Sequence, residues 1–403
     1  MKKYIIILAV LLGAFPFTLN SQTTDESYRR SSLYSLCISH DKAKYAAEID
    51  DIFVNMPVPD KFDNHDLNIK LISSMDRKED EKAISEFLDR NSVGRRLVAK
   101  WFGRDPATGC CCLDLISKRG LYDADYYDVE LARQSLRGEA MLRDAGEELI
   151  KNTFVLVNDI RYVDKENAAK IGGGLLKLGG AILQAYTGTN ISSSTDQLAA
   201  LVEGIRGFRV IVTSYLYQLE WNDDVANKFY KSYYIAEDKT DDDKMFAFNN
   251  DVETFRLKFV GAKRIDSGQT SYVGVFEPKD MIRKVCQRAI DKSVVELQKT
   301  YDEFKVKTPI YAMAPHITAK IGLKEGMTDK SRYEVLERVK NDKGVTQYKR
   351  VGVIAPIPGK IWDNRYMAVE EKSEGSDLTC STFKKVSGGD FQPGMLIREM
   401  KIQ

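Results

Sequence analysis

Two long runs of β-forming residues, at 205–221 and 255–276, constrain the fold of this chain more than any other feature. In both runs, apolar residues recur among polar or basic ones, which is typical of strands with one buried face. The "DSGQ" at 266–269 predicts a turn into a further strand. An amphipathic helix is predicted over 280–304. The pattern therefore predicts a sheet that is covered by at least one helix.

Further helix and strand signals precede these runs. The apolar residues of 128–151 recur at helical spacing and lead into "TFVLVNDI" (153–160), which predicts a helix followed by a strand. The apolar run at 97–102 lies between turn residues and predicts a buried strand. Residues 22–93 are highly charged, and the helical spacing at 84–88 predicts a mostly helical N-terminal module.

The chain changes character near residue 306. Short β-like runs then alternate with turn signals such as "NDKG" (341–344) and "SGGD" (387–390), a spacing typical of a small all-β barrel. We therefore expect an α+β protein with a mixed or antiparallel sheet, packed helices, a helical N-terminal region and a C-terminal barrel. The expected domains are a signal peptide (1–21), the helical module (22–93), an α/β domain (94–305) with a glycine-rich insertion (166–198), and the barrel (306–403).

The N-terminus predicts export. Lys2 and Lys3 precede an apolar run at 4–17, and small and polar residues follow up to Ser21. This is the three-part layout of a secretory signal, and the apolar run is too short for a transmembrane helix. Because the first cysteine is Cys37, we expect no lipid anchor of the bacterial lipoprotein kind. The expected location is the periplasm or the periphery of the outer membrane.

The charge balance argues against nucleic acid as a partner. The chain has 60 Lys and Arg residues and 59 Asp and Glu residues, a formal net charge of +1. Nucleic-acid binding needs a basic face, and a near-neutral balance gives no case for one. The hydrophobic content of 43% also argues against wholesale disorder.

The glycine-rich segment "KIGGGLLKLGGAILQAYTG" (170–188) is the candidate binding segment. Its Gly-x4-Gly spacing lacks the Lys and the Ser or Thr of a phosphate-binding loop, and Lys177 interrupts it as a membrane span. As a helix it is amphipathic, and its glycines allow close backbone approach. The apolar side comprises Ile171, Leu175, Leu178 and Ile182. That side packs on its own domain, on a partner or neighbouring subunit, or on a membrane surface; the sequence leaves these alternatives open.

No residue pattern predicts catalysis, a metal site or a cofactor. The cysteines at 110–112 are consecutive, whereas paired zinc ligands are usually separated by two or more residues. These cysteines are either buried thiols or include one partner of a disulfide. His40, His65 and His316 are scattered, without the spacing of a metalloprotease helix, and no G-x-S-x-G motif occurs. We predict no catalytic, metal-binding or cofactor-binding residue.

The order of the segments resembles a known family. The segments concerned are "RRLVAKWF" (95–102), "NTFVLVNDI" (152–160), "FRVIVTSYLYQ" (208–218), "FRLKFVGAKRIDSGQTSYVGVF" (255–276), "MIRKVCQRAIDKSVVEL" (281–297), "IGLKEGMTDKSRYEVLE" (321–337) and "RVGVIAPI" (350–357). They are similar to the periplasmic assembly proteins of the curli-exporter CsgG and flagellar FlgT kind. The resemblance implies a CsgG-like α/β domain, an SH3-like barrel and docking on an envelope machine.

Two departures limit what the resemblance implies. CsgG-type exporters are lipoproteins whose membrane-spanning hairpins form a pore, but this chain lacks the lipid-accepting cysteine. Its candidate hairpin region, 222–251, is strongly charged at "KTDDDK" (239–244), which suits a solvated loop better than lipid-facing strands. Pore formation is therefore not expected.

These features predict an exported, non-enzymatic envelope protein that acts as an assembly or scaffold component and binds other envelope proteins without a cofactor. A homo-oligomer and a peripheral contact with the outer membrane are further expectations. Two alternatives stay open. One is a secreted hydrolase acting on envelope or polysaccharide substrates, and the other is a surface adhesive or carbohydrate-binding module, which tyrosine clusters such as "FYKSYY" (229–234) favour.

Overall fold

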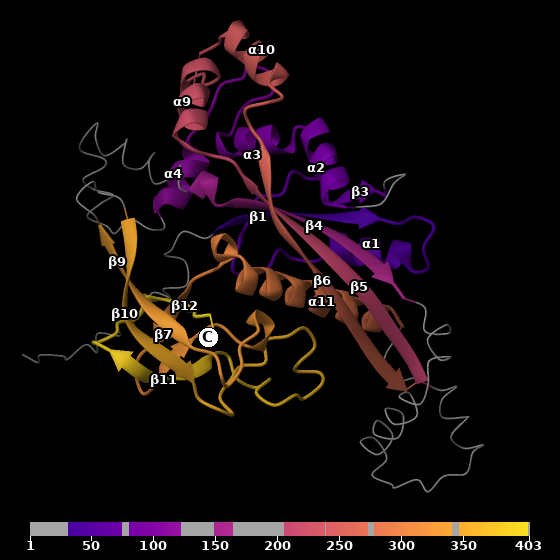
Figure 1. Cartoon of the computed structure of the whole chain (residues 1–403), viewed down its shortest axis with the longest axis vertical. Helices are drawn as coiled ribbons and strands as arrows, with labels where there is room; N and C mark the ends of the chain where they lie inside the picture. The colour runs from indigo at the N-terminus through magenta and orange to yellow at the C-terminus, as the bar shows by residue number, and fades with distance from the viewer. Residues whose placement is uncertain are drawn as a thin grey trace, which may run out of the picture.

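The computed structural model describes residues 31–74, 80–121, 149–163, 205–237, 239–272, 278–340 and 346–401. Within these ranges the chain forms a mixed sheet with helices on both faces and an antiparallel sheet that closes into a barrel (Figure 1). The expected α+β class is therefore confirmed.

The mixed sheet has the strand order β2-β1-β4-β5-β6, and β3 also pairs with β1. Its strands are β1 (Ser32–Ser39), β2 (Asp63–Asn64), β3 (Leu71–Ser73), β4 (Thr153–Tyr162), β5 (Ile205–Leu219) and β6 (Leu257–Tyr272). β1 is parallel to β2, β3 and β4, whereas β5 is antiparallel to β4 and β6. The strands predicted at 153–160 and in the two long runs are confirmed.

Strand β6 continues through the turn that was expected at 266–269, so that prediction is wrong. In the ladder with β5, Asp266 lies opposite Ile211 and Gly268 lies opposite Arg209. The Asp266 carboxylate also accepts a hydrogen bond from Arg209 Nε at 2.7 Å. The ladder satisfies the backbone and the ion pair holds the side chains, so strand pairing overrides the turn preference of these residues.

The N-terminal region is not a mostly helical module, because residues 32–39 form β1 inside the sheet. The helices α1 (Ala46–Val54) and α2 (Glu81–Arg90) do form, and α2 matches the helix predicted there. Both faces of β1 are buried: its even-numbered apolar residues enter one core, and on the other face Leu33 and Cys37 enter two further cores. A strand buried on both faces lacks the alternation that distinguishes a strand from a short buried helix.

The strand predicted at 97–102 is also wrong, since this segment belongs to helix α3 (Val93–Trp101). Leu97, Val98 and Trp101 recur at helical spacing and are buried in the core between α3 and the sheet. The run is too short for its apolar content alone to distinguish a strand from a helix.

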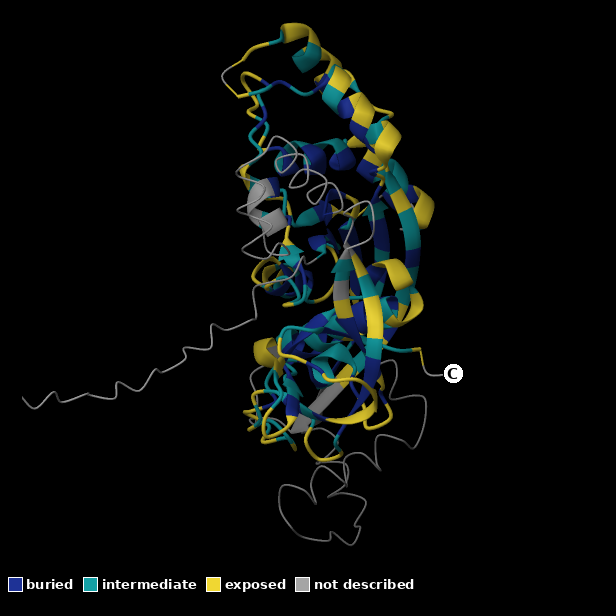
Figure 2. Cartoon of the chain, turned by 90° about the vertical axis from the view of Figure 1, so that its left-hand side faces the viewer, coloured by how far each residue is buried: buried dark blue, intermediate teal, exposed yellow. Residues whose placement is uncertain are grey.

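Helices cover both faces of the sheet, with the buried residues gathered between the layers (Figure 2). One core contains residues of α2, α3 and α4 (Asp114–Leu121). The opposite face packs on α1 and on α11 (Pro278–Thr300), whose residues Ile282, Val285 and Leu297 are buried against it. The amphipathic helix predicted near 280–304 is therefore confirmed.

The C-terminal strands form a closed barrel in the order β10-β11-β8-β7-β12-β9, with every pair antiparallel. They are β7 (Thr308–Ala312), β8 (Ile317–Ala319), β9 (Tyr333–Lys340), β10 (Thr346–Pro356), β11 (Ser381–Gly388) and β12 (Leu396–Glu399). Tyr333, Ile354 and Phe383 lie in its core. That this barrel is SH3-like stays a prediction.

Helix α11 joins the two units, because one side packs on the sheet and another side contacts the barrel (Figure 1). Lys284 and Arg288 both pair with Glu371, which lies in the long connection between β10 and β11; the Arg288 Nη2 to Glu371 Oε2 distance is 2.7 Å. Lys324, beside β8, pairs with Asp60 at 3.1 Å. We call this set of contacts the junction.

The glycine-rich segment at 170–188, with Ile171, Leu175, Leu178 and Ile182, lies outside the described residues, as does most of the helix predicted at 128–151. Among the helices within the described ranges, none is long and apolar enough to cross a membrane.

Candidate functional site: a protruding aromatic lobe

Between β5 and β6 the chain leaves the sheet and forms a lobe, residues 220–256, at the top of Figure 1. It contains the helices α9 (Asp223–Ser232) and α10 (Asp242–Asn250). The charged residues at 239–243 are mostly exposed, as expected, but the region forms two helices and not a loop, so that part of the prediction is wrong.

Side-chain caps explain why the charged residues form helices. The side chain of Asn222 accepts a hydrogen bond from the Val225 N–H at 3.0 Å, and that of Asp241 accepts one from the Lys244 N–H at 3.0 Å. Both helices carry acidic residues in their first turn, where the helix dipole favours negative charge. The aspartates at 241–243 therefore begin a helix.

Aromatic side chains fill the interior of the lobe. The rings of Phe102 and Phe229 stack with centroids 4.1 Å apart. The cluster comprises Phe102, Trp221, Phe229, Tyr230, Tyr233, Tyr234, Phe248 and Phe255. Aromatic pairs contribute about 0.5–1.5 kcal/mol beyond their buried area, so this core holds α9 and α10 together.

Two arginines from the preceding part of the chain fasten the lobe backbone. Arg95 Nη1 donates hydrogen bonds to the carbonyl oxygens of Phe248 at 3.2 Å and Asp251 at 2.9 Å. Arg104 Nη1 donates to the carbonyl oxygen of Tyr233 at 2.9 Å, and its guanidinium lies 4.2 Å from the centroid of the Phe248 ring. The C-terminal ends of both lobe helices are thus held by charged donors.

Asp251 directly follows α10, and its carboxylate connects the end of this helix to neighbouring parts of the lobe. It accepts hydrogen bonds from the hydroxyls of Tyr233 and Thr254 and from the backbone N–H groups of Glu253 and Thr254, the latter two at 2.8 Å. Burial opposes ionisation of this group, but the hydrogen bonds outweigh it and hold the pKa of Asp251 well below its usual range.

The cysteine triplet supports the lobe. The Cys111 N–H donates to the Ile235 carbonyl at 2.8 Å, and the Cys112 N–H donates to the Phe102 carbonyl at 2.8 Å. All six cysteines of the chain are free thiols. The described residues hold no group of three or more His, Cys, Asp or Glu side chains placed to bind a metal ion. The two backbone hydrogen bonds connect the triplet to Ile235 in the lobe and to Phe102 in its aromatic core.

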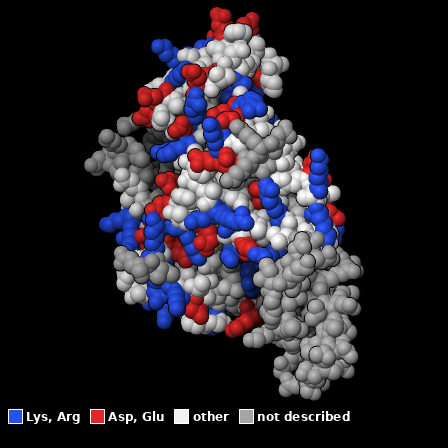
Figure 3. Space-filling view, turned by 45° about the vertical axis from the view of Figure 1, so that its right-hand side comes forward, with Lys and Arg blue, Asp and Glu red and all other residues white. Residues whose placement is uncertain are grey.

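The outer surface of the lobe carries the two most exposed large hydrophobic side chains of the described chain, Phe246 (70% exposed) and Val252 (73% exposed). Asp242 and Asp243 lie one helical turn before Phe246, and Glu253 follows Val252. These three acids are exposed and have no ion-pair partner among the described residues. We call these five residues the crest, and acidic side chains are visible at that end of the molecule in Figure 3.

The crest is not among the sites predicted from the sequence, although the sequence contains one signal for it. Phe246 and Phe248 are two positions apart on α10, about 200° around the helix. One ring can therefore enter the aromatic core only if the other faces away from it. Phe248 is 3% exposed and Phe246 is the ring left in solvent.

The three histidines lie apart from the lobe and from one another. His65 is buried and stacks on Trp101 with ring centroids 4.7 Å apart, and burial lowers its pKa to about 3. His316 is exposed. His40 directly follows β1, and its Nε2 lies 2.7 Å from Asp159 Oδ1 on β4.

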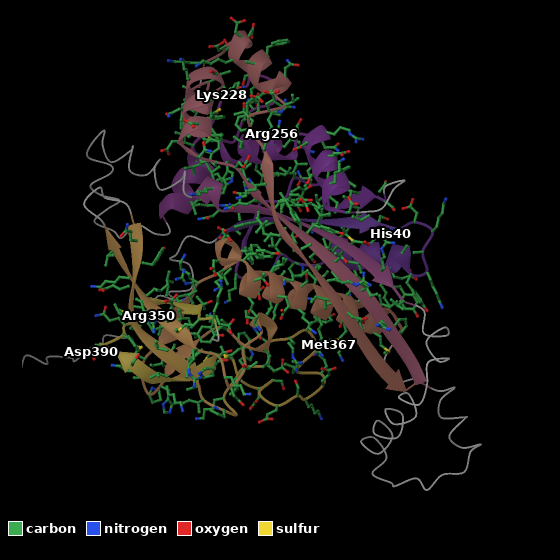
Figure 4. All side chains as sticks on the ribbon, in the orientation of Figure 1. His40, Lys228, Arg256, Arg350, Met367 and Asp390 are labelled. Atoms are coloured by element: carbon green, nitrogen blue, oxygen red, sulfur yellow. The ribbon has the colours of Figure 1, made fainter. Side chains whose placement is uncertain are left out.

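The His40–Asp159 pair is a second, smaller candidate site. Figure 4 labels His40. It lies at the carboxyl ends of the parallel strands β1 and β4, a frequent position for ligands. Arg161 Nε lies 3.0 Å from both Asp159 oxygens. Burial alone would raise the pKa of Asp159, but the hydrogen bonds from His40 and Arg161 lower it. Because 119 positions separate His40 from Asp159, no local motif could reveal the pair.

Comparison with known proteins assigns no family to the chain. No protein-family model matches it, and no curated protein matches it.

Proposed function

We propose that this protein is an exported, non-enzymatic assembly or scaffold component of the bacterial envelope, which binds other envelope proteins through the crest. The crest is the observation that carries the proposal. An aromatic side chain in a polar rim is typical of the residues that dominate protein interfaces. The acids around Phe246 and Val252 favour a partner surface with basic residues.

The construction of the lobe supports binding as the role of the crest. Association costs less free energy when the binding residues are already held in place. Phe246 stands on α10, whose buried side is fixed by Phe248 in the aromatic core and by Arg95 at the helix end. The backbone that carries the exposed ring is therefore already held in place before a partner binds.

The family resemblance supports the same role. The long β5–β6 pair, the helix α11 behind it and the closed antiparallel barrel are the elements that the resemblance leads us to expect. We extend the proposal to a CsgG-like sheet domain, an SH3-like barrel, and a location in the periplasm or at the outer-membrane periphery without a lipid anchor.

A photo-crosslinking amino acid at position 246 tests this function in the native envelope. We expect adducts with envelope proteins at position 246, and their loss when Val252→Ser is added. The same amino acid at Val369, which is 68% exposed on the barrel side, is the matched control. Equal labelling at positions 246 and 369 would contradict the proposal.

The His40–Asp159 pair favours a hydrolase as the second candidate. A carboxylate that orients an imidazole is a common arrangement for a general base. The test is hydrolysis of envelope polysaccharides and peptides by the intact chain and by His40→Gln. Activity that is lost in His40→Gln but retained in His316→Gln would favour the hydrolase over the scaffold.

A further inference from the structure

One edge of the mixed sheet is interrupted, because two short strands pair with the same edge of β1 and leave a gap between them. β2 pairs with β1 at residues 32–33, and β3 pairs with it at residues 37–39. Residues 34–36 of β1 are therefore not paired with any described strand on that edge. We call this gap, between the β2 and β3 ladders, the notch.

Ser35 is the residue whose backbone faces the notch. In a parallel pair, alternate residues direct both their N–H and their C=O toward the same neighbour. The Leu33 carbonyl accepts from the residue after β2 at 3.0 Å, and the Cys37 N–H donates to the residue before β3 at 2.8 Å, so odd-numbered residues of β1 face this edge. The connection 65–70, which the structure describes throughout, forms no hydrogen bond with the Ser35 backbone. A donor and an acceptor therefore lie side by side in the notch.

The notch adjoins a pocket on the side of the sheet that α1 covers. Ser35 and Asn158 line the pocket from the sheet, and Phe53 and Met56 line it from the end of α1. Ser35 is the one interior residue of β1 that is not buried, whereas Asn158 is fully buried. Because the Asn158 side chain accepts a hydrogen bond from Ser214 Oγ at 2.6 Å, it is a fixed polar group beside the apolar wall.

The charged groups around the pocket are engaged by the protein itself. Asp66 and Lys70 also line the pocket and have opposite charges. The Asp66 carboxylate accepts from the Asn68 N–H, and Lys70 Nζ donates to the Val54 carbonyl at 2.7 Å. Neither charge is directed at a ligand, so the pocket favours a neutral group.

One kind of neutral group matches the Ser35 backbone. A primary carboxamide carries an acceptor oxygen and a donor NH2 in one planar head, so it can bond to the N–H and the C=O at once. A carboxylate offers acceptors only, and a guanidinium offers donors only. In a trans secondary amide the N–H and C=O point in opposite directions. We propose that the notch binds a primary carboxamide through paired hydrogen bonds with the backbone of Ser35, while the aliphatic stem of the ligand packs on Met56.

The register also limits the length of the ligand. The groups that flank Ser35 on this edge, the Leu33 carbonyl and the Cys37 N–H, are already hydrogen-bonded. An added strand would therefore find only one residue to pair with, whereas a single head group satisfies Ser35 completely. Such a head group ends the side chains of asparagine and glutamine in a partner protein, and it also occurs in small primary amides. The site lies on the sheet and not on the lobe, so this inference goes beyond the function proposed for the crest.

Nuclear magnetic resonance on the full chain labelled with 15N-serine tests the inference. The Ser35 amide resonance is assigned by its loss in Ser35→Ala. We expect propionamide to shift this resonance downfield until it saturates. Propionate and N-methylacetamide should bind about tenfold more weakly or worse, because each leaves a backbone group unpaired. Equal binding of the three compounds, or no saturable shift with propionamide, would overturn the inference.

A substitution that fills the pocket tests its part in binding. Met56→Trp should abolish the shift, whereas Val54→Trp, at a position that is 39% exposed and outside the pocket lining, should keep it. A folded Met56→Trp chain that binds propionamide as well as wild type would overturn the inference. The comparison of the three compounds uses the wild-type chain, so it decides the matter even if Met56→Trp fails to fold.

A fourth and a fifth ligand identify the source of the carboxamide. N-acetylglutamine N-methylamide represents a side chain of a partner protein, and its glutamate counterpart is the matched control. Tighter binding of the glutamine compound than of propionamide would support a protein side chain, and the reverse order would support a small amide. Equal binding of the glutamine and glutamate compounds would overturn the inference. Crosslinking at position 246 does not enter these measurements, so the inference and the proposed function can fail separately.

Discussion

The lobe and the junction each contain an aspartate that is shielded from solvent, but the pKa values of the two aspartates are shifted in opposite directions. Asp251 in the lobe accepts four hydrogen bonds from hydroxyl and backbone donors, and its pKa is lowered. Asp291 on α11 faces the junction, and its Oδ2 is shielded from water without a hydrogen-bond partner. Burial and the negative charges of Glu325 and Asp60 raise the pKa of Asp291 to about 7. The positive charges of Lys324 and Arg288 act in the opposite direction but are outweighed.

This contrast indicates different roles for the two regions. The lobe is a firmly packed support for the crest, which we call a platform, whereas the junction connects the sheet to the barrel. In the lobe, hydrogen bonds satisfy the shielded carboxylate of Asp251, and the acids of the crest lie on the outer surface without an ion-pair partner among the described residues. The junction does the reverse, because Lys284 and Glu371 pair where solvent is largely excluded, and Lys284 is 3% exposed. Uncompensated charge on a firmly packed surface points to binding, whereas paired charge between two units points to their relative placement.

The largest expected effect comes from breaking the aromatic core of the lobe. Phe229 is fully buried at the centre of that core, so Phe229→Ala should cost about 4 kcal/mol of stability by leaving a cavity. Urea unfolding measures the loss. Hydrogen exchange should show it in α9 and α10 before the barrel strands.

Asn227→Ala, on the exposed side of α9, is the control and should change stability by less than about 0.5 kcal/mol. If Phe229→Ala instead loosened the barrel and the lobe equally, the lobe would not be a separately packed platform.

A slightly smaller effect is expected at the junction. Glu371→Ala removes the carboxylate shared by Lys284 and Arg288, and removing one partner of a buried ion pair costs about 3 kcal/mol. Urea unfolding should show this loss, and small-angle scattering should show whether the barrel separates from the sheet. The neighbouring exposed residue gives the control, Glu370→Ala, with an expected change below about 0.5 kcal/mol. If the two substitutions had equal effects, the ion pairs of Glu371 would not stabilise the junction, and the contrast with the lobe would not hold.

The parts of the fold that were predictable from sequence are those with long periodic patterns. β5, β6 and α11 each contain enough residues for alternation or helical spacing to be unambiguous. β1 and α3 were misassigned because a short, fully buried apolar run fits a strand and a helix equally well. The turn expected at 266–269 failed because pairing with β5 outweighs local preference.

The candidate site was less predictable than the fold. The lobe was expected to be a loop because its aspartates were interpreted as solvated charge, whereas Asp241 caps a helix. The exposure of Phe246 depends on which ring of α10 enters a core that includes Phe102, and that contact is tertiary. The segment around Leu175 that the sequence favoured for binding lies outside the described residues, and its role stays a prediction.

The pH dependence of stability sharpens the contrast between the two aspartates. Because the folded-state pKa of Asp291 is raised from 3.8 to about 7, the native chain binds more protons than the unfolded chain between these values. The contribution of this group to stability therefore falls as pH rises from about 4 to about 7, and stays low above that. Asp291→Asn should be more stable than wild type at pH 8, by about 1 kcal/mol or more, and nearly equal to it near pH 4.

Urea midpoints at both pH values check this prediction. Asp329→Asn, at an exposed position in the same unit as Lys324, should leave the pH dependence unchanged. A stability difference for Asp291→Asn that is the same at pH 4 and pH 8 would mean that the carboxyl does not titrate at the junction.

The smallest expected effect on stability is at the crest, and it decides whether the lobe is a platform. Phe246→Ser should change the free energy of unfolding by less than about 0.5 kcal/mol, because the ring is already 70% exposed. Phe248→Ser, two positions along the same helix, should cost several times more, since that ring is 3% exposed and packs on Phe229. Thermal unfolding of the two variants measures the difference. A large loss in Phe246→Ser would make its ring part of the lobe's packing, whereas an unchanged melting temperature together with lost association would assign it to binding alone.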